Sequence, residues 1–449
     1  MATHNLSGLT RRRLLSAGTV GLAGLVAGRL SGSDGRPKVE RPRATSGDVV
    51  QPDWGERLTV TVGTQKGDLV GATDKPIQAA VDYVARLGGG TVHILPGTYR
   101  LDNAVYLRSG VRLLGSGDES VLIKTPSIST NLAEDSDWYD QEVTLVDAAG
   151  FQVGDGVCLQ ATNPDTQSTE VLKRTLVARS GNRFKLDRAL RENFWVKELP
   201  TVSKLFPVLS GEEIEDIVIE KITLDGNKAN NENLNGNYAG CIFLQDCTRI
   251  QMRQVTARAY NGDGISWQIC HDVIVEDSHS HGHAGYGLHP GSGSQRPLMR
   301  RNRLEDNELG LFFCWGVKYG LAEENTIVDN HRFGVSIGHR DTDNLIRNNE
   351  ILRSGEVGVL FRKERGRAFA PHRNRLENNR IIDSGAEEGI GVDVQGETES
   401  VMIVSNEIRE TRGALKRTGV RIGAETSDIQ LVGNRIVGFS QEVADLHNA

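Results

Sequence analysis

The chain has 449 residues, of which 25% are charged, and its formal net charge is −7 at pH 7. This mildly acidic balance, without a large basic patch, argues against a nucleic-acid partner. Aromatic residues make up only 5% of the chain, whereas there are 51 glycines, which suits many tight turns and small stacked side chains. Length alone suggests two or three domains, but solenoids run long as single units.

Residues 1–50 are interpreted as a targeting segment and a linker. Thr10-Arg11-Arg12-Arg13-Leu14-Leu15 precedes a weakly hydrophobic stretch from Ser16 to Gly28, and residues 29–50 are mostly Gly, Pro, Ser and charged residues. The first part is typical of a twin-arginine export signal, with a basic disordered tail as the alternative. We therefore expect a periplasmic or extracellular protein. The apolar stretch is too short to be a convincing membrane span, so no membrane partner is expected beyond the export signal.

Residues 51–126 are expected to begin the fold with a capping helix and the first strands. Thr73 can cap a helix whose first turn contains Pro76, and an apolar stripe follows at helical spacing: Ile77, Ala80, Val81, Val84 and Leu87. Strands are expected at 91–95, 110–114 and 121–124. A helix over the open end of a solenoid would keep its strand edges from aggregating.

Residues 127–210 interrupt this pattern. Short strands are expected at 143–146, 157–160, 175–178 and 183–186, which predicts an inserted small β-barrel or hairpin cluster. This inserted subdomain could line one wall of a groove, or it could only pack on the outside of the solenoid. The sequence slightly favours the second role.

Residues 211–449 contain a repeat with a period of 23 or 24 residues over most of its length. Each unit has a glycine followed by an apolar–any–apolar triplet, at Gly240, Gly264, Gly287, Gly310, Gly334 and Gly358, with looser copies at Gly389 and Gly419. A second series runs in step: Asn302, Asn325, Asn349, Asn379, Asn406 and Asn434. A fixed period marks a solenoid, and triplets this short suit strands. The sequence therefore predicts an all-β protein, a right-handed parallel β-helix in which each coil climbs about 4.8 Å.

The cysteines and histidines give no firm metal or disulfide site. Five cysteines, an odd number, argue against a disulfide framework. Cys247 and Cys270 lie one period apart and should stack, and a reduced pair is favoured over a disulfide. The series His279, His281 and His283 has the spacing of a transition-metal site, but a flexible turn is favoured. Calcium would need clustered acidic residues, and none stands out, so no cofactor is predicted.

The outward-facing side chains of the repeat predict a polar cluster on three adjacent coils. If the first and third triplet residues face the core, the middle ones face out: Ser266, His289, Phe312, Ser336 and Leu360. A second outward column should contain Gln268, Gly291, Cys314, Gly338 and Arg362, and later Asp393. The cluster itself consists of Asp263, Tyr286, His289, Glu308 and Arg332. Substrate-binding roles are expected for Gln268, Arg362, Lys363 and Asp393.

Two stretches resemble known families. Residues 77–99, with Gly88-Gly89-Gly90 and Leu95-Pro96-Gly97-Thr98-Tyr99, resemble the opening of pectate-lyase-superfamily proteins. Tyr286-Gly287-Leu288-His289-Pro290-Gly291 resembles the Tyr-Gly-Phe-Asp-Pro-His motif of mannuronan C5-epimerases, which are parallel β-helix enzymes that act on alginate. The likeness extends to residues 224–227 and 330–334. Tyr286 and Arg332 match the family, whereas His289, Gly291 and Cys314 stand where the family has Asp, His and a further Asp.

The resemblance and the cluster together imply chemistry on a uronate-containing polysaccharide. Proton abstraction beside a carboxylate needs a base, an acid and a cation. His289 can be the base, and Arg332 can bind the carboxylate unless it pairs with Glu308 or Glu356 instead. Tyr286 could take part only if nearby positive charge lowers its pKa. The outcome would be epimerisation or β-elimination.

Two other functions stay open. One is glycoside hydrolysis by two carboxylates, Asp263 with Glu308 or Asp306. The other is carbohydrate binding without catalysis. The sequence says nothing about the oligomeric state.

Overall fold

The computed structural model describes residues 53–163 and 167–448. The predicted export signal and linker, residues 1–50, lie outside the described residues. Within the described part, no helix has the length and apolar character needed to cross a bilayer.

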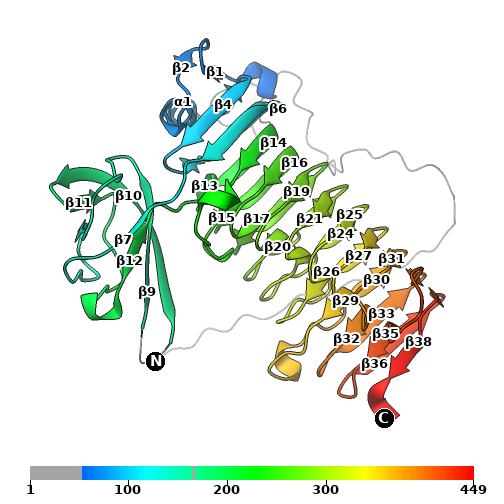
Figure 1. The fold of residues 1–449 in the computed structure, drawn as a ribbon. Coiled ribbons are helices and arrows are strands. Elements are labelled where there is room, and N and C mark those ends of the chain that lie inside the picture. The colour runs from blue at the N-terminus through cyan, green and yellow to red at the C-terminus, as the bar shows by residue number, and fades with distance from the viewer. Residues whose placement is uncertain (1–52, 164–166, 449) are drawn as a thin grey trace, which may run out of the picture. The chain divides into compact units, whose positions relative to one another are not determined.

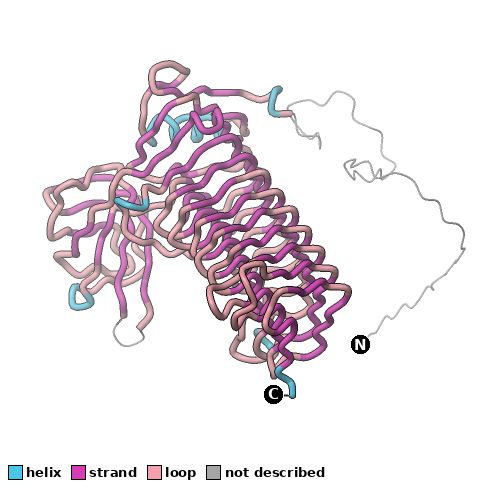
Figure 2. The backbone as a smooth tube through the Cα atoms, turned by 45° about the vertical axis from the view of Figure 1, so that its right-hand side comes forward, coloured by secondary structure: helices cyan, strands magenta, loops and turns pink. Residues whose placement is uncertain are grey.

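The chain forms a parallel β-helix whose coils stack one on the next (Figures 1 and 2). One face is an 11-stranded parallel sheet, which we call the site sheet. Its strands are β5 Val105–Tyr106, β13 Leu209–Glu212, β15 Gly240–Gln245, β17 Asp263–Gln268, β20 Tyr286–Pro290, β23 Leu309–Phe312, β26 Phe333–Ile337, β29 Val357–Phe361, β32 Ile390–Val394, β35 Thr418–Ile422 and β38 Gln441–Asp445.

The remaining parallel strands form a 21-stranded sheet that wraps the other faces. Its first strands are β1 Thr59–Gly63, β2 Leu69–Val70, β3 Gly90–Ile94, β4 Gly97–Leu101, β6 Val111–Lys124, β14 Glu215–Asp225 and β16 Thr248–Arg258. One later series is β18 His271–Glu276, β21 Leu298–Arg300, β24 Leu321–Glu323, β27 Leu345–Arg347, β30 Arg375–Glu377, β33 Glu399–Val404 and β36 Ser427–Val432. The other is β19 His279–His281, β22 Arg303–Glu305, β25 Thr326–Val328, β28 Glu350–Leu352, β31 Arg380–Ile382, β34 Glu407–Arg409 and β37 Arg435–Val437.

Stacked apolar side chains fill the inside of the coils. One inward column of the site sheet consists of Ile242, Ile265, Leu288, Leu311, Val335, Val359, Val392 and Val420. All eight are buried in the main core. Each strand is too short to be stable alone, so burial against the coils above and below stabilises it. The predicted all-β solenoid fold is therefore confirmed.

The predicted asparagine series forms a buried hydrogen-bonded ladder. The side-chain amide of Asn325 donates to Asn349 Oδ1 at 2.8 Å, and that of Asn349 donates to Asn379 Oδ1 at 2.9 Å. The residue before each ladder asparagine has a positive φ, as in Asn348 at 54°. This left-handed backbone is rare for residues other than glycine, and the ladder bonds offset its cost at each turn.

The predicted capping helix is α1 Asp74–Arg86, which begins after the N-cap residue Thr73. Its buried stripe, Ile77, Ala80, Val81 and Val84, packs into the main core. The inclusion of Leu87 in that stripe was wrong. Leu87 lies at the C-cap and is 57% exposed, because the helix ends at Arg86 and the next residue no longer lies on its buried face.

The segment inserted between β6 and β13 forms a separate six-stranded antiparallel sheet with its own apolar core. Its strands are β7 Ser129–Asn131, β8 Glu142–Thr144, β9 Gly156–Thr162, β10 Thr169–Ser180, β11 Arg183–Leu186 and β12 Thr201–Ser203. An antiparallel bridge between Leu132 and Leu145 joins the two edges of this sheet, which makes it barrel-like. Short 3-10 turns complete the described chain: η1 Trp54–Glu56, η2 Val196–Glu198, η3 Lys228–Asn230, η4 Arg367–Phe369 and η5 Leu446–Asn448.

Three register assignments made from the repeat were wrong. Gly240 pairs with Asp263 rather than Gly264, one residue out of step. Gly391, not Gly389, aligns with Gly358, because Val392 pairs with Val359. Asp393 pairs with Leu360, so it belongs to the column of Ser266 and His289 and not to that of Arg362. The coils differ in length, so the repeated glycine does not always occupy the same position of the strand. The period of the repeat alone cannot reveal such shifts.

Candidate active site

The central feature of the site sheet is a buried pair formed by Asp263 on β17 and His289 on β20. His289 Nδ1 lies 2.7 Å from Asp263 Oδ2, and the two side chains are 3% and 2% exposed. The backbone N–H of Tyr286 donates to the other carboxylate oxygen, Asp263 Oδ1, at 2.9 Å. A carboxylate held in this way keeps a proton on Nδ1 and leaves Nε2 as the acceptor.

The other ring nitrogen of His289, Nε2, is buried and has no hydrogen-bond partner among the described residues. Buried polar atoms are normally paired, so an unpaired imidazole nitrogen marks a place where another molecule can bind. We call Asp263 and His289 the dyad.

Glycines make room for the dyad. A Cβ atom added at Gly236 or Gly285 would collide with the carboxylate of Asp263. The carbonyl oxygen of Gly236 also accepts a hydrogen bond from Ser266 Oγ at 2.6 Å, so the loop after η3 lies against the dyad. This fit requires residues without side chains on both sides of Asp263.

Aromatic rings cover His289 from the next positions of the sheet. The ring of Tyr286 lies edge-on to His289 at 5.3 Å, and Phe312 lies 5.2 Å from His289 and 4.3 Å from Tyr286 between ring centroids. Burial raises the pKa of Tyr286 to about 12, and the negative charge of Asp263 acts in the same direction. The sequence set a pKa lowered by positive charge as the condition for catalysis by Tyr286, and this condition is not met: the pKa is raised, and Tyr286 is a neutral phenol near pH 7.

Glu308 and Arg332 lie beside the dyad rather than within it. They stack as predicted, since Arg332 N–H donates to the Glu308 carbonyl at 3.0 Å. The guanidinium of Arg332 turns toward Glu356, with Nε 2.9 Å from Oε1, and lies 3.9 Å from Glu308. Arg332 is thus held in the exposed ion pair that the sequence offered as the alternative.

Arg362 is the cation that contacts the rings over the dyad. Its Cζ atom lies 4.5 Å from the centroid of Phe312, and it donates to Ser336 Oγ at 2.8 Å. A side chain at Gly338 would collide with this guanidinium, so the glycine allows the arginine to lie flat on the sheet. The neighbouring Lys363 turns away and pairs with Glu425 at 2.8 Å.

Gln268 explains one departure from the epimerase motif. Its side chain is 5% exposed and donates to Ser266 Oγ at 3.2 Å. A Cβ atom at Gly291 would overlap the carboxamide of Gln268, so the motif histidine has no room here. Cys314, which replaces a family Asp, has its thiol pKa raised to about 12 by burial and stays protonated.

Asp393 and the three clustered histidines contact residues other than the dyad. Asp393 is buried and accepts from Arg421 Nε at 2.8 Å. The rings of His279 and His281 stack at 4.1 Å, whereas His283 is buried elsewhere in the coil. Among residues 53–163 and 167–448, no group of three metal-ligating side chains comes together.

All five cysteines are free, and the backbone N–H of Cys247 donates to Cys270 Sγ at 3.4 Å.

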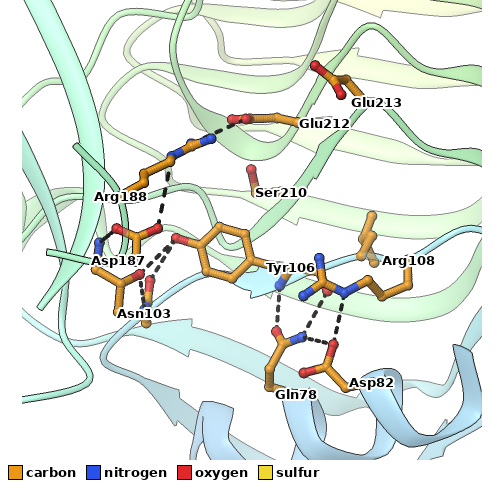
Figure 3. Close-up of a pocket in the computed structure, with 12 residues that line it drawn as sticks. Gln78, Asp82, Asn103, Tyr106, Arg108, Asp187, Arg188, Ser210, Glu212 and Glu213 are labelled. Carbon is orange, nitrogen blue, oxygen red and sulfur yellow. Dashed lines mark hydrogen bonds and ion pairs between the residues drawn. The ribbon is translucent and has the colours of Figure 1, made fainter. Parts of the chain in front are cut away.

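A separate pocket of about 560 Å³ lies where α1, the inserted sheet and the start of the site sheet meet (Figure 3). Its polar lining is paired internally, with Arg108 Nε 2.9 Å from Asp82 and Arg188 3.4 Å from Glu212. None of the predicted site residues lines it. Lys173, whose Nζ lies 3.7 Å from the centroid of Phe243, covers the sheet between this pocket and the dyad.

Sequence reasoning missed most of the side chains in the turns beyond Arg362. Trp315, His339, Arg340, Arg365 and Phe369 form a cluster on the turns that follow three successive strands of the site sheet. These positions lie outside the strand triplets, so the repeat did not draw attention to them. The available signal for this cluster was a tryptophan, Trp315, in a polar turn where its side chain would be exposed.

Comparisons with known proteins place the chain among β-helix proteins. Residues 221–366 match the family model described as a right-handed beta helix region, which agrees with the predicted handedness. The mannuronan C5-epimerase AlgE2 of Azotobacter vinelandii is 22% identical over 72% of this chain, and AlgE3 is 24% identical over 70%. The chain spans only 24% and 12% of the length of these two relatives.

A solved structure with a similar fold is PfbA, a surface adhesin of Streptococcus pneumoniae. It is 12% identical, the match covers 80% of this chain and 87% of that one, and the TM-score is 0.50. This likeness concerns the fold alone. The chain is thus a right-handed β-helix related in sequence to mannuronan C5-epimerases.

Proposed function

We propose that this protein is a polysaccharide-modifying enzyme that removes the C5 proton of a uronate unit, with His289 as the base. The observation that carries the proposal is the dyad: Asp263 fixes Nδ1 of a buried histidine, and Nε2 has no described protein partner. The relationship to mannuronan C5-epimerases supports a uronate polymer as the substrate. The twin-arginine pattern of residues 10–15 supports action outside the cytoplasm.

The proposed reaction conserves protons and electrons in two steps. His289 Nε2 takes the C5 proton, and the electron pair of the C–H bond moves into the uronate carboxylate. Tyr286, neutral because its pKa is about 12, then donates a proton. Donation to C5 from the opposite face gives the epimer. If instead the C4–O bond breaks and the phenol protonates the leaving oxygen, an unsaturated uronate end forms.

A cation must stabilise the charge that develops on the uronate carboxylate. Arg362 lies on Phe312, which touches both Tyr286 and His289, and is 20% exposed at its side chain. We assign this role to Arg362 first, because it lies on Phe312 and its own carboxylate partners, Asp341 and Glu364, are 3.6 and 3.7 Å away. Arg332 comes second, because it holds Glu356 more closely, at 2.9 Å. Since the rings of Tyr286 and Phe312 cover His289, they must turn aside when the sugar enters.

Glycoside hydrolysis fits this site less well. It needs two carboxylates about 5–9.5 Å apart, one of them free to hold or donate a proton. Asp263 already uses one oxygen for His289 and the other for the backbone of Tyr286. Glu308, the expected second carboxylate, lies beside the dyad with Oε1 3.9 Å from Nε of Arg332. Proton abstraction is therefore the better match to the geometry.

The test is product analysis in heavy water. The protein is incubated with polymannuronate, polyguluronate, polygalacturonate and a neutral mannan, and the products are analysed by proton NMR and ultraviolet absorbance. Epimerisation should place deuterium at C5 of inverted units, and elimination should give unsaturated ends. Saturated reducing ends without deuterium would identify a hydrolase and overturn the proposal. Retention of a polymer that is never altered would identify a binding protein.

A further inference from the structure

Next to the dyad, on the turns that follow β23, β26 and β29, lies a row of stacked aromatic and guanidinium groups. The rings of Trp315 and His339 are 4.6 Å apart with an interplanar angle of 22°, and His339 lies 5.0 Å from Phe369. Arg340 lies 4.3 Å over Phe369, and Arg365 lies 5.0 Å from the same ring and 5.9 Å from Trp315. We call these five residues the ledge.

The outer part of the ledge is exposed, whereas His339 is only 6% exposed and Phe369 is half-buried. Trp315 is 57% exposed, and Arg340 and Arg365 are exposed as well. Its members come from three successive coils, so the row runs along the axis of the solenoid. A single exposed aromatic residue needs no explanation, but an exposed indole that stacks on a second ring and lies between exposed guanidinium groups indicates a binding site.

The arginines of the ledge differ from the other turn arginines of this protein. Those at the turns of the larger sheet pair with an aspartate one coil below, as Arg301 does with Asp277 and Arg353 with Asp329, at 2.7 Å and 2.6 Å. In the described part of the chain, neither Arg340 nor Arg365 forms an ion pair. Within residues 53–163 and 167–448, the one contact of the ledge to a carboxylate is that of His339 Nδ1 with Glu364, at 3.4 Å. The ledge therefore offers two guanidinium groups to an anion.

The ledge is continuous with the dyad through Phe312 and Arg362. Phe312 packs on Tyr286, and Trp315 follows it by three residues in the chain. Arg362 lies on Phe312, and Arg365 follows Arg362 by three residues. A polymer that places one unit at His289 would meet the ledge with its next units, because neighbouring coils are only about 4.8 Å apart.

We propose that the ledge binds the flanking units of an anionic polysaccharide, with uronate carboxylates on Arg340 and Arg365 and a sugar face on Trp315. This inference rests on the proposed function, which places one sugar unit at His289 and so sets the direction in which the polysaccharide runs. Guanidinium groups pair with carboxylates through two parallel hydrogen bonds, and they remain charged at every working pH. The indole offers a flat apolar surface to the C–H groups of a pyranose ring.

The experiment measures binding separately from turnover. Titration calorimetry with a mannuronate hexasaccharide, and with a neutral mannose hexasaccharide as the comparison, is carried out on the His289→Gln protein so that the ligand is not consumed. Arg340→Ala/Arg365→Ala and Trp315→Ala are added to that background. The double arginine change removes the charge-assisted hydrogen bonds to the carboxylates, and Trp315→Ala removes the surface under the sugar, so each should weaken binding of the uronate hexasaccharide by about tenfold or more.

The matched control is Arg353→Ala, which removes an arginine that is also exposed but is paired with Asp329 on another face. It should leave the affinity unchanged. Equal affinity in the ledge variants and the control, equal affinity for the neutral hexasaccharide, or no binding at all would overturn the inference. If the ledge binds the uronate but the unmodified protein converts no polymer, the ledge stands and the proposed catalytic function falls, so the two failures are distinguishable.

Discussion

His289 Nδ1 lies 2.7 Å from the carboxylate of Asp263, although the two residues are 26 positions apart and lie on different coils. One coil of the solenoid separates them, so the distance in sequence becomes a single strand spacing in space. The pair is buried, which keeps water from competing for the hydrogen bond and fixes the imidazole in one orientation. A fixed orientation is what a base needs in order to meet one particular C–H bond.

Replacement of either member of the dyad should remove turnover without unfolding the protein. His289→Gln loses the base, a change worth about 10²–10⁴-fold in rate. Asp263→Asn should cost a similar factor, because an amide that donates to Nδ1 would move the imidazole proton to Nε2. The turnover number on the active polymer checks both, with Arg353→Ala as the folding and activity control. Either variant keeping more than a tenth of the parent rate would contradict the assignment.

Tyr286→Phe should separate the two proton transfers. Without the phenol, His289 can still take the C5 proton and return it, but no proton arrives from the opposite face. We expect the variant to exchange C5 hydrogen for solvent deuterium while forming no epimer or unsaturated end. NMR of the recovered polymer in heavy water measures both. Product formation at the parent rate would show that another group is the acid.

The pH profile of the unmodified protein tests the raised pKa of Tyr286 independently of the Tyr286→Phe variant. Burial raises the pKa of this phenol to about 12, so it stays protonated where an ordinary tyrosine, with a pKa near 10, would ionise. Activity should therefore persist as the pH rises through 10, provided that the fold remains intact by circular dichroism.

The adjacency of Asp263 and Tyr286 could be predicted because a regular coil turns sequence period into contact. The direction of a long side chain could not. Arg332 was expected at the site, but its guanidinium swings to Glu356, and only the local competition between carboxylates decides this. Asp393 was misplaced because the coil before β32 is longer than the repeat. Most of the ledge was missed because residues such as Trp315 lie in turns, where strand alternation carries no information.

Disruption of the asparagine ladder should destabilise the solenoid most at its middle. Asn349 accepts from the backbone and the side chain of Asn325, and its own amide donates to the carbonyl of Ala322 at 3.0 Å. Asn349→Leu would leave several buried polar groups unpaired, at about 1–3 kcal/mol each. We expect a loss of about 2–5 kcal/mol in the free energy of unfolding, measured in urea.

The matched control for the ladder is Asn434→Leu at its C-terminal end. Asn434 accepts from Asn406 in the same way but is only half-buried, so water can replace the lost bonds. Its cost should be clearly smaller. Equal costs at both positions would mean that the ladder does not act through burial.

His283 should make the fold sensitive to mild acid. Its Nδ1 accepts from the backbone N–H of Tyr260 at 3.0 Å, and Nε2 lies 3.1 Å from the Ala257 carbonyl, so the buried ring must be neutral. Burial lowers its pKa to about 3. The stability it contributes is complete above its unfolded pKa of about 6.5 and is lost as the pH falls toward 3, by about 2 kcal/mol between pH 6.5 and 5.

The comparison that isolates this effect is His283→Gln, which does not titrate. The difference in unfolding free energy between the two proteins, measured in urea, should shrink by that amount from pH 6.5 to pH 5. A constant difference, or an NMR titration of the His283 ring above pH 5, would show that the imidazole is not held neutral.

Lys124 should be a buried cation whose removal stabilises the protein. Its ammonium lies 4.5 Å from the centroid of Phe206 and 5.2 Å from that of Tyr260, and the residue is only 1% exposed. Burial lowers its pKa to about 7, because an ammonium in an apolar interior loses its hydration. The folded protein therefore holds the proton less tightly than the unfolded chain, whose lysine has a pKa near 10.4.

The sign of the pH dependence follows from this difference. The unfolded chain binds more protons between about pH 7 and 10.4, so the stability of the parent protein falls as the pH decreases through that window and is lowest below it. Lys124→Met keeps the volume and removes the charge. It should raise the free energy of unfolding by on the order of 4 kcal/mol at pH 7 and below, and by little above pH 10.4. Denaturation in urea at pH 6, 8 and 10 measures this trend. A gain that does not shrink as the pH rises would mean that the pKa of Lys124 is not lowered in the folded protein.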